Sequence, residues 1–576
     1  DGFFDLGGDS ISAIRLVARA RQAGLVFSPK DVFRHQSVQA LALVAVEEEG
    51  VEAEPEGAGT GPVQPTPIMH WLAGREGPVS GFSQTVVLRV PPGLGLEPLT
   101  AAVQAVLDRH DTLRLVCRGL LSAMNIAESN PRPGGPVGGL EVLPAGAVAA
   151  AGCVRRVEVV DDLAGAGAGS AAAGWEEAPP AAAVPVTEEA WAVLVSREAA
   201  RSRAGLDPAC GRMVQVAWLD AGPGVSGRLV VTVHHLSVDG VSWRILLPDL
   251  FAAWEAAGRG EEPVLDPVPT SFRTWARRLH AEAAERTGEL DFWIEILDGP
   301  DPRIGRRPLD PGKDVAATVR TLMRTLPPGR TEPLLTTLPA AFHGRANDVL
   351  LAGLALAVAH WRRKRGGRGT SVLLDLEAHG REEIFPGVDL SRTVGWFTGM
   401  YPVRLDAGTG GWTGESAAAQ AIKRVKEQLR AIPDNGIGYG LLRHLNPGTS
   451  DELADLPQPQ IVFNYLGRVA VAEGDWNLVP ADPAEPGGHD PQMPVSHVLE
   501  INVTVHDRAD GPHLEAAWSW PDGVLGETEV AELADTWFEA LGGLAEHGSG
   551  GYTPSDLLVD LDQEEIDRIQ AAWERR

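Results

Sequence analysis

Strand-like apolar runs alternate with amphipathic helical patterns from Pro67 onward, and this order restricts the fold more than any other feature of the chain. FSQTVVLRV (82–90) and RLVVTVHH (228–235) have the branched apolar residues of strands, whereas VSWRILLPDLFAAWEAAG (241–258) has the apolar spacing of a helix. The alternation returns after FRTWARRLHAEAAE, in the runs TSVLLDL, QIVFNYLGR and HVLEINVTVHD. This pattern predicts an α/β fold.

The first 46 residues differ from this pattern, because they contain only short helical periods. Helices are expected from Asp9 to Gly24, from Pro29 to Phe33 and from Ser37 to Val46. The apolar surface of such a unit is too small for independent stability, so we expect it to be part of an all-α domain.

Three further stretches lack any periodic apolar face. Residues 47–66 are rich in acidic residues, Gly and Pro, which is typical of a linker. Residues 118–139 and 164–185 are rich in Gly, Pro or Ala, and we expect surface loops there.

Composition excludes several classes of partner. The chain carries 78 acidic and 50 basic side chains, a formal net charge of −28, which repels phosphate backbones and anionic lipid and argues against nucleic-acid and membrane partners. Its cysteines, Cys117, Cys153 and Cys210, form no C-x-x-C pair, so we expect no metal site and no disulfide, as in the reducing cytoplasm. The longest apolar run, 349–359, is about half the length that spans a bilayer and predicts a buried helix.

Two short stretches place reactive side chains where chemistry is possible. LGGDSI puts Ser10 at a helix N-terminus, where it is either a capping residue or an attachment point for a phosphodiester. VTVHHLSVDGVSW ends a strand with His234 and His235, of which only one can face a given cavity because strand side chains alternate. From these residues alone, a structural role for the two histidines is favoured over a catalytic one.

Several motifs in a fixed order make the chain similar to nonribosomal peptide synthetases. LGGDSI resembles the phosphopantetheine attachment motif of peptidyl carrier domains, and HHLSVDGVSW resembles the HHxxxDGxSW signature of epimerization domains, which are relatives of condensation domains. EAHGRE and FNYLGR resemble later motifs, with Ala378 in place of Gly, and PIMHWLAGREGPVSGFSQTVVL resembles the opening motif, with Met69 in place of Gln.

This resemblance implies a two-lobed, chloramphenicol-acetyltransferase-like α/β fold preceded by a partial all-α carrier domain. The implied parts are a partial carrier domain at 1–46, a linker at 47–66, an N-terminal lobe at 67–270, a C-terminal lobe at 271–550 and, at 551–576, a linker towards a following module.

The resemblance also assigns roles to the histidine motif. Ser10 carries 4'-phosphopantetheine, His235 is the catalytic histidine and His234 is its positioning neighbour. Asp239 is implied as an ion-pairing residue that holds the loop, with Arg114 of RHDTLRL as its expected partner.

A second acid/base is implied on the opposite side of the reaction centre. Glu377, the first glutamate of EAHGRE, has this role, with Glu382 as the alternative within the motif. Removal of a proton next to a thioester carbonyl needs a base, an acid on the other face and donors at the carbonyl oxygen. Asn464 and Tyr465 can supply such donors, although a core role for the Tyr465 ring is equally open.

The implied function is epimerization of the α-carbon of an aminoacyl or peptidyl thioester on a carrier domain, between an upstream adenylation domain and a downstream condensation domain. Two alternatives remain at this stage. One is a condensation domain that forms a peptide bond, and the other is a degenerate domain that docks the carrier without catalysis.

Overall fold

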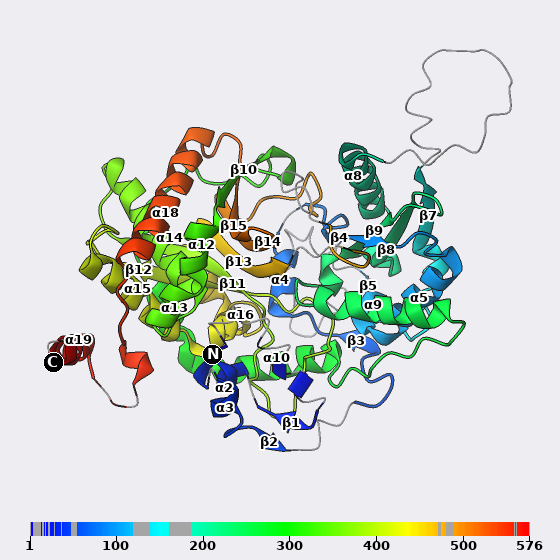
Figure 1. Cartoon of the computed structure of the whole chain (residues 1–576), viewed down its shortest axis with the longest axis horizontal. Coiled ribbons are helices and arrows are strands. Elements are labelled where there is room, and N and C mark those ends of the chain that lie inside the picture. Colours follow the sequence, from blue (N-terminus) through cyan, green and yellow to red (C-terminus); the bar gives the residue numbers. More distant parts are fainter. Residues whose placement is uncertain are drawn as a thin grey trace, which may run out of the picture.

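Six strands form the central sheet of the C-terminal lobe in the computed structural model, in the order β10-β15-β14-β13-β11-β12 (Figure 1). β13 runs parallel to both β11 and β14, whereas the other neighbouring pairs are antiparallel. The strands are β10 (Val319–Leu326), β11 (Ser371–Ala378), β12 (Gly399–Asp406), β13 (Ile461–Ala470), β14 (Leu499–Arg508) and β15 (Gly511–Pro521).

The structure describes most of the chain between residues 54 and 557 and parts of both ends. The described residues are 2–47 without 4–7, 9–12, 14, 15, 18, 21, 22, 28 and 36, followed by 54–75, 77–118, 139–159, 186–470, 474–479, 488–557, 559 and 561–574. The two loops expected at 118–139 and 164–185 lie almost wholly outside these residues.

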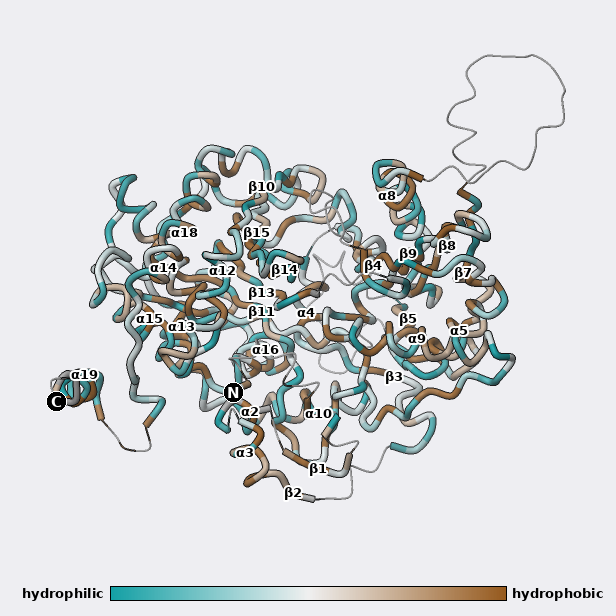
Figure 2. The backbone as a smooth tube through the Cα atoms, in the orientation of Figure 1, coloured by the Kyte–Doolittle hydropathy of each residue, from teal (hydrophilic) through white to brown (hydrophobic). Residues whose placement is uncertain are grey.

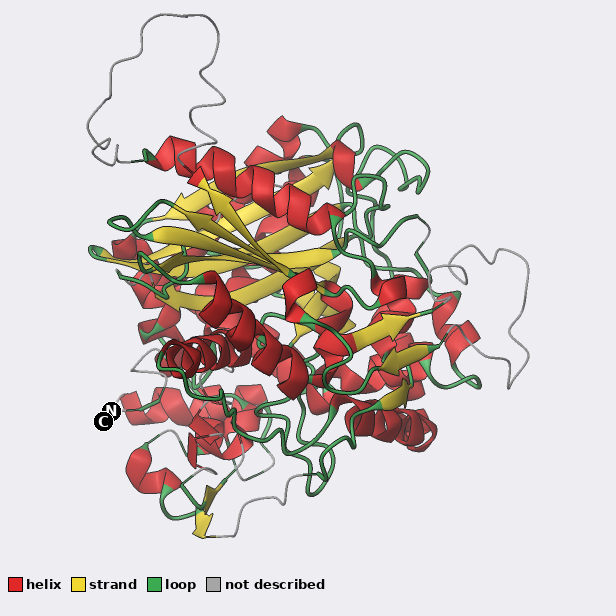
Figure 3. Cartoon of the chain, turned by 90° about the vertical axis from the view of Figure 1, so that its right-hand side faces the viewer, coloured by secondary structure: helices red, strands yellow, loops and turns green. Residues whose placement is uncertain are grey.

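Side-chain alternation gives the six-stranded sheet two different faces. Along β14, Leu499, Ile501 and Val503 are buried in the core of the lobe, whereas Glu500 and Asn502 line a cavity on the other face. Three helices that contact one another cover the core face: α14 (Ala346–Lys364), α15 (Glu415–Arg430) and α18 (Glu527–His547). Figure 3 shows this sheet with its twist and its flanking helices.

The N-terminal lobe contains two smaller sheets. Its four-stranded sheet has the order β4-β9-β8-β7, and its three-stranded sheet has the order β3-β6-β5. These strands are β3 (Gly61–Val63), β4 (Ser83–Val90), β5 (Leu115–Cys117), β6 (Leu140–Val142), β7 (Val154–Glu158), β8 (Val214–Asp220) and β9 (Gly227–His234). β3 lies inside the stretch expected to be a linker.

Helices complete the N-terminal lobe and connect it to the C-terminal lobe. α5 (Leu96–Arg109) packs against α9 (Trp243–Gly258), and α8 (Glu188–Ala204) packs on β8 and β9. α16 (Ile437–His444) contacts β12 of the large sheet as well as α4 (Pro67–Ala73) and α10 (Phe272–Glu285). Further helices in the described part of the chain are α11 (Leu290–Leu297), α12 (Pro328–Leu335), α13 (Thr337–Ala341), α17 (Ser450–Ala454) and α19 (Gln563–Glu574).

Each lobe has its own apolar core, and Figure 2 shows the apolar stretches inside both lobes. Residues 349–359, within α14, are all buried, as predicted from this apolar run. Met69 is fully buried in the core of the N-terminal lobe, so the apolar residue at this position of the opening motif packs there. None of the described helices combines the length and apolarity that a bilayer-spanning helix needs.

The described part of the N-terminal unit contains two short helices between two short, paired antiparallel strands. β1 (Leu25–Val26) pairs with β2 (Val46–Glu47), and α2 (Pro29–Arg34) precedes α3 (Val38–Leu41). The helix expected from Ser37 to Val46 does begin after Ser37, whose hydroxyl accepts the Ala40 N–H at 3.2 Å. It ends early because the chain turns after Leu41 and residue 46 pairs with β1.

Candidate active site

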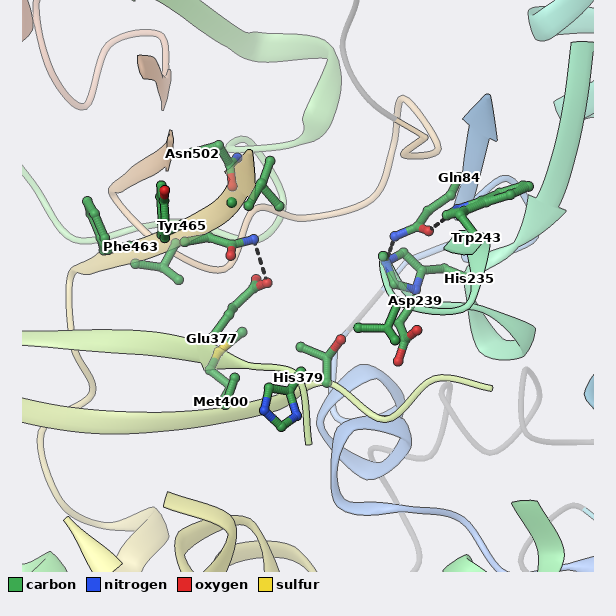
Figure 4. Close-up of a pocket in the computed structure, with 18 of the residues that line it drawn as sticks. Gln84, His235, Asp239, Trp243, Glu377, His379, Met400, Phe463, Tyr465 and Asn502 are labelled. Carbon is green, nitrogen blue, oxygen red and sulfur yellow. Dashed lines mark hydrogen bonds between the residues drawn. The ribbon is translucent and has the colours of Figure 1, made fainter. Parts of the chain in front are cut away.

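A cavity of about 1310 Å³ separates the two cores. From the N-terminal lobe it is lined by β4 and by the segment between β9 and α9, and from the C-terminal lobe by β11, β13 and β14. Figure 4 shows His235 and Glu377 on opposite sides of this open space. Two residues that are more than a hundred positions apart in the sequence thus face one cavity.

His235 begins the short 3-10 turn that follows β9. Its backbone N–H donates to Phe82 O at 2.9 Å, and its ring stacks on the Phe82 ring with centroids 4.7 Å apart at 9°. The Trp396 ring lies 4.7 Å away on a tilted plane, and the Gln84 amide nitrogen is 2.9 Å from His235 Nε2. Burial among these groups lowers the pKa of His235 to about 4.

His234 occupies the last position of β9 and is fully buried. Its Nε2 lies 2.9 Å from Val79 O, and its Nδ1 accepts the Leu236 N–H at 3.2 Å. The neutral ring therefore uses both nitrogens on the backbone, and burial lowers its pKa to about 4. His234 holds the chain at the turn, while only His235 of the pair lines the cavity.

Asp239 forms a buried ion pair, but the expected partner was wrong. Its Oδ2 lies 2.5 Å from Arg381 Nη1, and both side chains are at most 4% exposed. Asp239 also accepts hydrogen bonds from Ser242 at 2.8 Å and from the Phe397 N–H at 3.1 Å. Arg381 is the fifth residue of EAHGRE, so the ion pair joins the histidine loop to the segment that follows β11.

Arg114 instead stabilises the turn in which it lies. Its guanidinium donates to the backbone oxygens of Leu107, of Asp108 at 2.8 Å and of Leu143 at 2.9 Å, and it pairs with Asp111 at 3.0 Å. These partners engage all of its nitrogens without Asp239. The motif RHDTLRL gave no indication of this local arrangement, because it does not show where the arginine points.

Glu377 lies at the end of β11 and points into the cavity. Its Oε2 accepts a hydrogen bond from the Asn464 amide at 2.8 Å. The side chain touches cavity solvent, yet the protein surrounds the cavity, and this desolvation raises the pKa of Glu377 to about 7, with Glu500 and Asp375 adding in the same direction. Substrate that displaces the cavity water strengthens the effect.

The alanine of EAHGRE causes no strain. Ala378 belongs to β11 and is not among the described residues with positive φ. Gly380, two residues later, has φ +66°, and a Cβ there would meet Phe397 O at 1.7 Å. The backbone therefore requires glycine at position 380 and accepts alanine at position 378.

Asn464 and Tyr465 differ in what they contact. The Asn464 side chain reaches Glu377, whereas Tyr465 packs against the core of the C-terminal lobe while also lining the cavity. In Figure 4 the Tyr465 hydroxyl points away from Glu377. Of the two expected donors, Asn464 is therefore engaged with the carboxylate.

Sequence reasoning missed three polar groups of the cavity. Gln84 contacts His235, and Glu500 with Asn502 lies on the same sheet face as Glu377, where Asn502 donates to Glu500 at 2.6 Å. Gln84 is a polar residue within the apolar run FSQTVVLRV, and Glu500 and Asn502 alternate with apolar residues in LEINVTV. That alternation marks the polar face of a strand and was an available signal.

Ser10, the expected attachment residue, lies outside the described residues. Gly8, two positions earlier, is described and lines the cavity. The end of a flexible phosphopantetheine arm on Ser10 fits a cavity of this size, which contains both His235 and Glu377. Among the described residues, no group of three His, Cys, Asp or Glu side chains is arranged to hold a metal ion.

Comparisons with known proteins identify the family of the chain. Residues 224–566 match the condensation domain family, and residues 1–44 match the phosphopantetheine attachment site. One of the linear gramicidin synthase proteins of Brevibacillus parabrevis is 34% identical over 99% of this chain, which spans 7% of that protein. Chondramide synthase cmdD of Chondromyces crocatus is 33% identical over 99% of the chain, which spans 13% of it.

Two of the solved structures that resemble the chain show the same architecture. The epimerization domain from the third module of tyrocidine synthetase B is 27% identical, with a TM-score of 0.68 over 86% of this chain and 99% of that one. The X-domain from teicoplanin biosynthesis shares the fold at 20% identity, with a TM-score of 0.57 over 88% of this chain and 100% of that one. The chain therefore belongs to the condensation-domain family of nonribosomal peptide synthetases, and it carries a phosphopantetheine attachment site ahead of that domain.

Proposed function

We propose that the chain epimerizes the α-carbon of an aminoacyl or peptidyl thioester on its carrier segment, converting the L form into an L/D mixture. The observation that supports this most directly is the placement of two acid/base groups, His235 and Glu377, on opposite sides of one cavity (Figure 4). Inversion at a carbon needs a proton to leave one face and another to reach the opposite face. A carbon between these two groups meets that requirement.

The protonation states favour the same reaction. With a pKa lowered to about 4, His235 is neutral near pH 6 and can accept a proton. With a pKa raised to about 7, Glu377 is largely protonated at that pH and can donate one. His235 thus takes the α-proton from one face while Glu377 protonates the enolate carbon from the other, and the reverse step restores both groups.

The carrier arm supplies the thioester, which makes the α-proton more acidic than that of a free amino acid. Gly8 at the cavity supports delivery from the same chain, because Ser10 follows two residues later. An upstream adenylation domain then selects the amino acid and a downstream condensation domain receives the epimerized product.

The likeness to the tyrocidine epimerization domain supports epimerization over peptide-bond formation. A condensation reaction needs one base to assist the attacking amine and has no role for a proton donor on the far face of the α-carbon. The protonated Glu377 is therefore better explained by epimerization.

Deuterium exchange tests the proposal. A carrier loaded with an L-aminoacyl thioester is incubated in heavy water, and the released acid is analysed for configuration and α-deuterium. We expect deuterium in both enantiomers, no uptake in His235→Ala or Glu377→Gln, and unchanged uptake in the surface control Glu532→Gln. Glu382→Gln distinguishes the two glutamates of the motif and is expected to retain exchange.

Two outcomes would reject epimerization in favour of the alternatives. Amide formation with an acceptor carrier, without deuterium uptake in its absence, assigns the chain to condensation. Binding of the loaded carrier with complete retention of the L configuration assigns it to docking alone.

A further inference from the structure

A hydrogen-bond relay connects the last residue of HHLSVDGVSW to the cavity histidine. Trp243, the first residue of α9, donates its indole N–H to Gln84 Oε1 at 2.7 Å. Gln84, the second residue of β4, places its amide nitrogen 2.9 Å from His235 Nε2. Figure 4 shows the three side chains in line at one wall of the cavity.

The indole N–H determines which group donates and which accepts in each of these hydrogen bonds. An indole N–H can only donate, so the Gln84 atom that it contacts must be the carbonyl oxygen. The other end of the amide is then the NH₂ group, which can only donate. His235 Nε2 must therefore accept, and the neutral imidazole carries its proton on Nδ1.

We propose that Trp243 and Gln84 are positioning residues: the indole fixes the Gln84 amide so that its NH₂ group holds Nε2 of His235 as the unprotonated nitrogen of the ring. The catalytic consequence rests on the proposed function, in which His235 accepts the α-proton. The relay keeps the ring ready to accept and resists the imidazolium, because a proton on Nε2 would face another donor. Gln84 can accommodate that proton only by rotating its amide, which breaks the bond to Trp243.

Other groups around His235 do not replace this contact. Phe82 and Trp396 cover the ring without hydrogen-bonding its edge, and both favour the uncharged form through desolvation. Asp239 on the same loop raises the pKa of His235, and His489, which packs on Phe82, lowers it. His234 is neutral and directs both nitrogens to the backbone. Among these groups, Gln84 contacts Nε2.

Titration of His235 by NMR tests the relay without relying on catalysis. The Cε1–H signal of the His235 ring is assigned in a deuterated protein as the signal that disappears from the spectrum of His235→Ala. In Gln84→Glu, a carboxylate accepts from both the indole and a protonated Nε2, and we expect the pKa of His235 to rise by about 1–3 units. In Trp243→Phe, the released amide can rotate to accept from Nε2, and we expect a rise of about one unit.

A double-mutant comparison separates a relay from a general effect of Trp243. Gln84→Met removes both hydrogen bonds at similar volume, so adding Trp243→Phe to it should leave the pKa of His235 unchanged. Trp254→Phe is the matched control: it deletes an indole bond from the same helix, to Leu94 O at 2.8 Å, away from the cavity, and should not shift the titration. If Trp243→Phe shifted the pKa of His235 equally in the wild-type and in the Gln84→Met background, the relay would be overturned. An unchanged pKa of His235 in Gln84→Glu would also overturn it.

Exchange kinetics then connect the relay to the reaction. At pH 5, a two-unit rise in the pKa of His235 leaves about a tenth of the ring neutral, so we expect about a tenfold slower deuterium exchange in Gln84→Glu with little change in KM. If the titration shifts as expected while wild-type protein shows no exchange, the proposed function fails and the relay stands.

Discussion

The two walls of the cavity hold their acid/base groups by different means. The His235 wall is aromatic: the ring lies against Phe82 and Trp396, and the Gln84 amide contacts its Nε2. The Glu377 wall is the polar face of a sheet, where an amide and a second carboxylate lie beside the glutamate. Despite this difference, both groups shift towards their uncharged forms: burial has this effect on His235, and the protein around the cavity, together with Glu500 and Asp375, has it on Glu377.

The consequence is an inverted order of pKa values. In water a glutamate titrates about two units below a histidine, whereas here the pKa of Glu377 is about 7 and that of His235 is about 4. Between these values the pair shares one proton, which resides on the carboxyl group while the imidazole is free to accept. Burial on one wall, and the surrounding protein with two nearby carboxylates on the other, thus set the two pKa values apart.

The largest expected effect comes from breaking the connection between the walls. The buried pair Asp239–Arg381 ties the histidine loop to the segment after β11, and removing one partner leaves the other charge buried. We expect Asp239→Ala and Arg381→Ala each to lose about 3–5 kcal/mol of unfolding free energy and all exchange activity. Urea unfolding followed by tryptophan fluorescence measures the first effect.

The exposed pair Arg306–Glu529 provides the control for this measurement. Its arginine side chain is 62% exposed, and Arg306→Ala should cost less than about 1 kcal/mol. Equal losses in the buried and the exposed pair would show that Asp239–Arg381 does not hold the walls together.

A second prediction concerns the pH dependence of exchange. A two-base reaction needs one proton on the pair, so the rate should fall below pH 4, where His235 is protonated, and above pH 7, where Glu377 is ionised. On each side of this range the exchange rate should fall about tenfold per pH unit. A plateau that continues unchanged from pH 7 to pH 9 would contradict this and show that His235 works alone.

The strand pattern predicted most of the fold because burial is periodic. The runs at 82–90 and 461–468 contain β4 and most of β13, and FRTWARRLHAEAAE is α10 from its first residue to its last. The expectation that His235 and Glu377 face one cavity came only from the family resemblance. Their separation along the sequence gives no information about their distance in space. The local sequence pattern therefore predicted the helices and strands, whereas the family resemblance predicted that His235 and Glu377 line the same cavity.

The predictions from sequence that were wrong or missing concern the directions in which long side chains point. Arg114 was expected to reach Asp239, yet it bonds to backbone oxygens within its own turn, while Arg381 makes the pair. Gln84 lies within the opening motif, but the motif does not show that its amide faces His235. Such contacts depend on how the two lobes pack, and the sequence of one strand or turn does not contain that information.

The smallest expected effect separates the two amides of the Glu377 wall. Asn464 donates to Glu377 and favours its ionised form, so Asn464→Ala should raise the pKa of Glu377 by up to about one unit and move the alkaline limb of the exchange profile to higher pH. Asn502, at the paired position of β14, donates to Glu500 instead. Its removal leaves the hydrogen bond from Asn464 to Glu377 intact, so Asn502→Ala should leave the limb in place. Shifts in the same direction for both variants would mean that the alkaline limb does not report on Glu377.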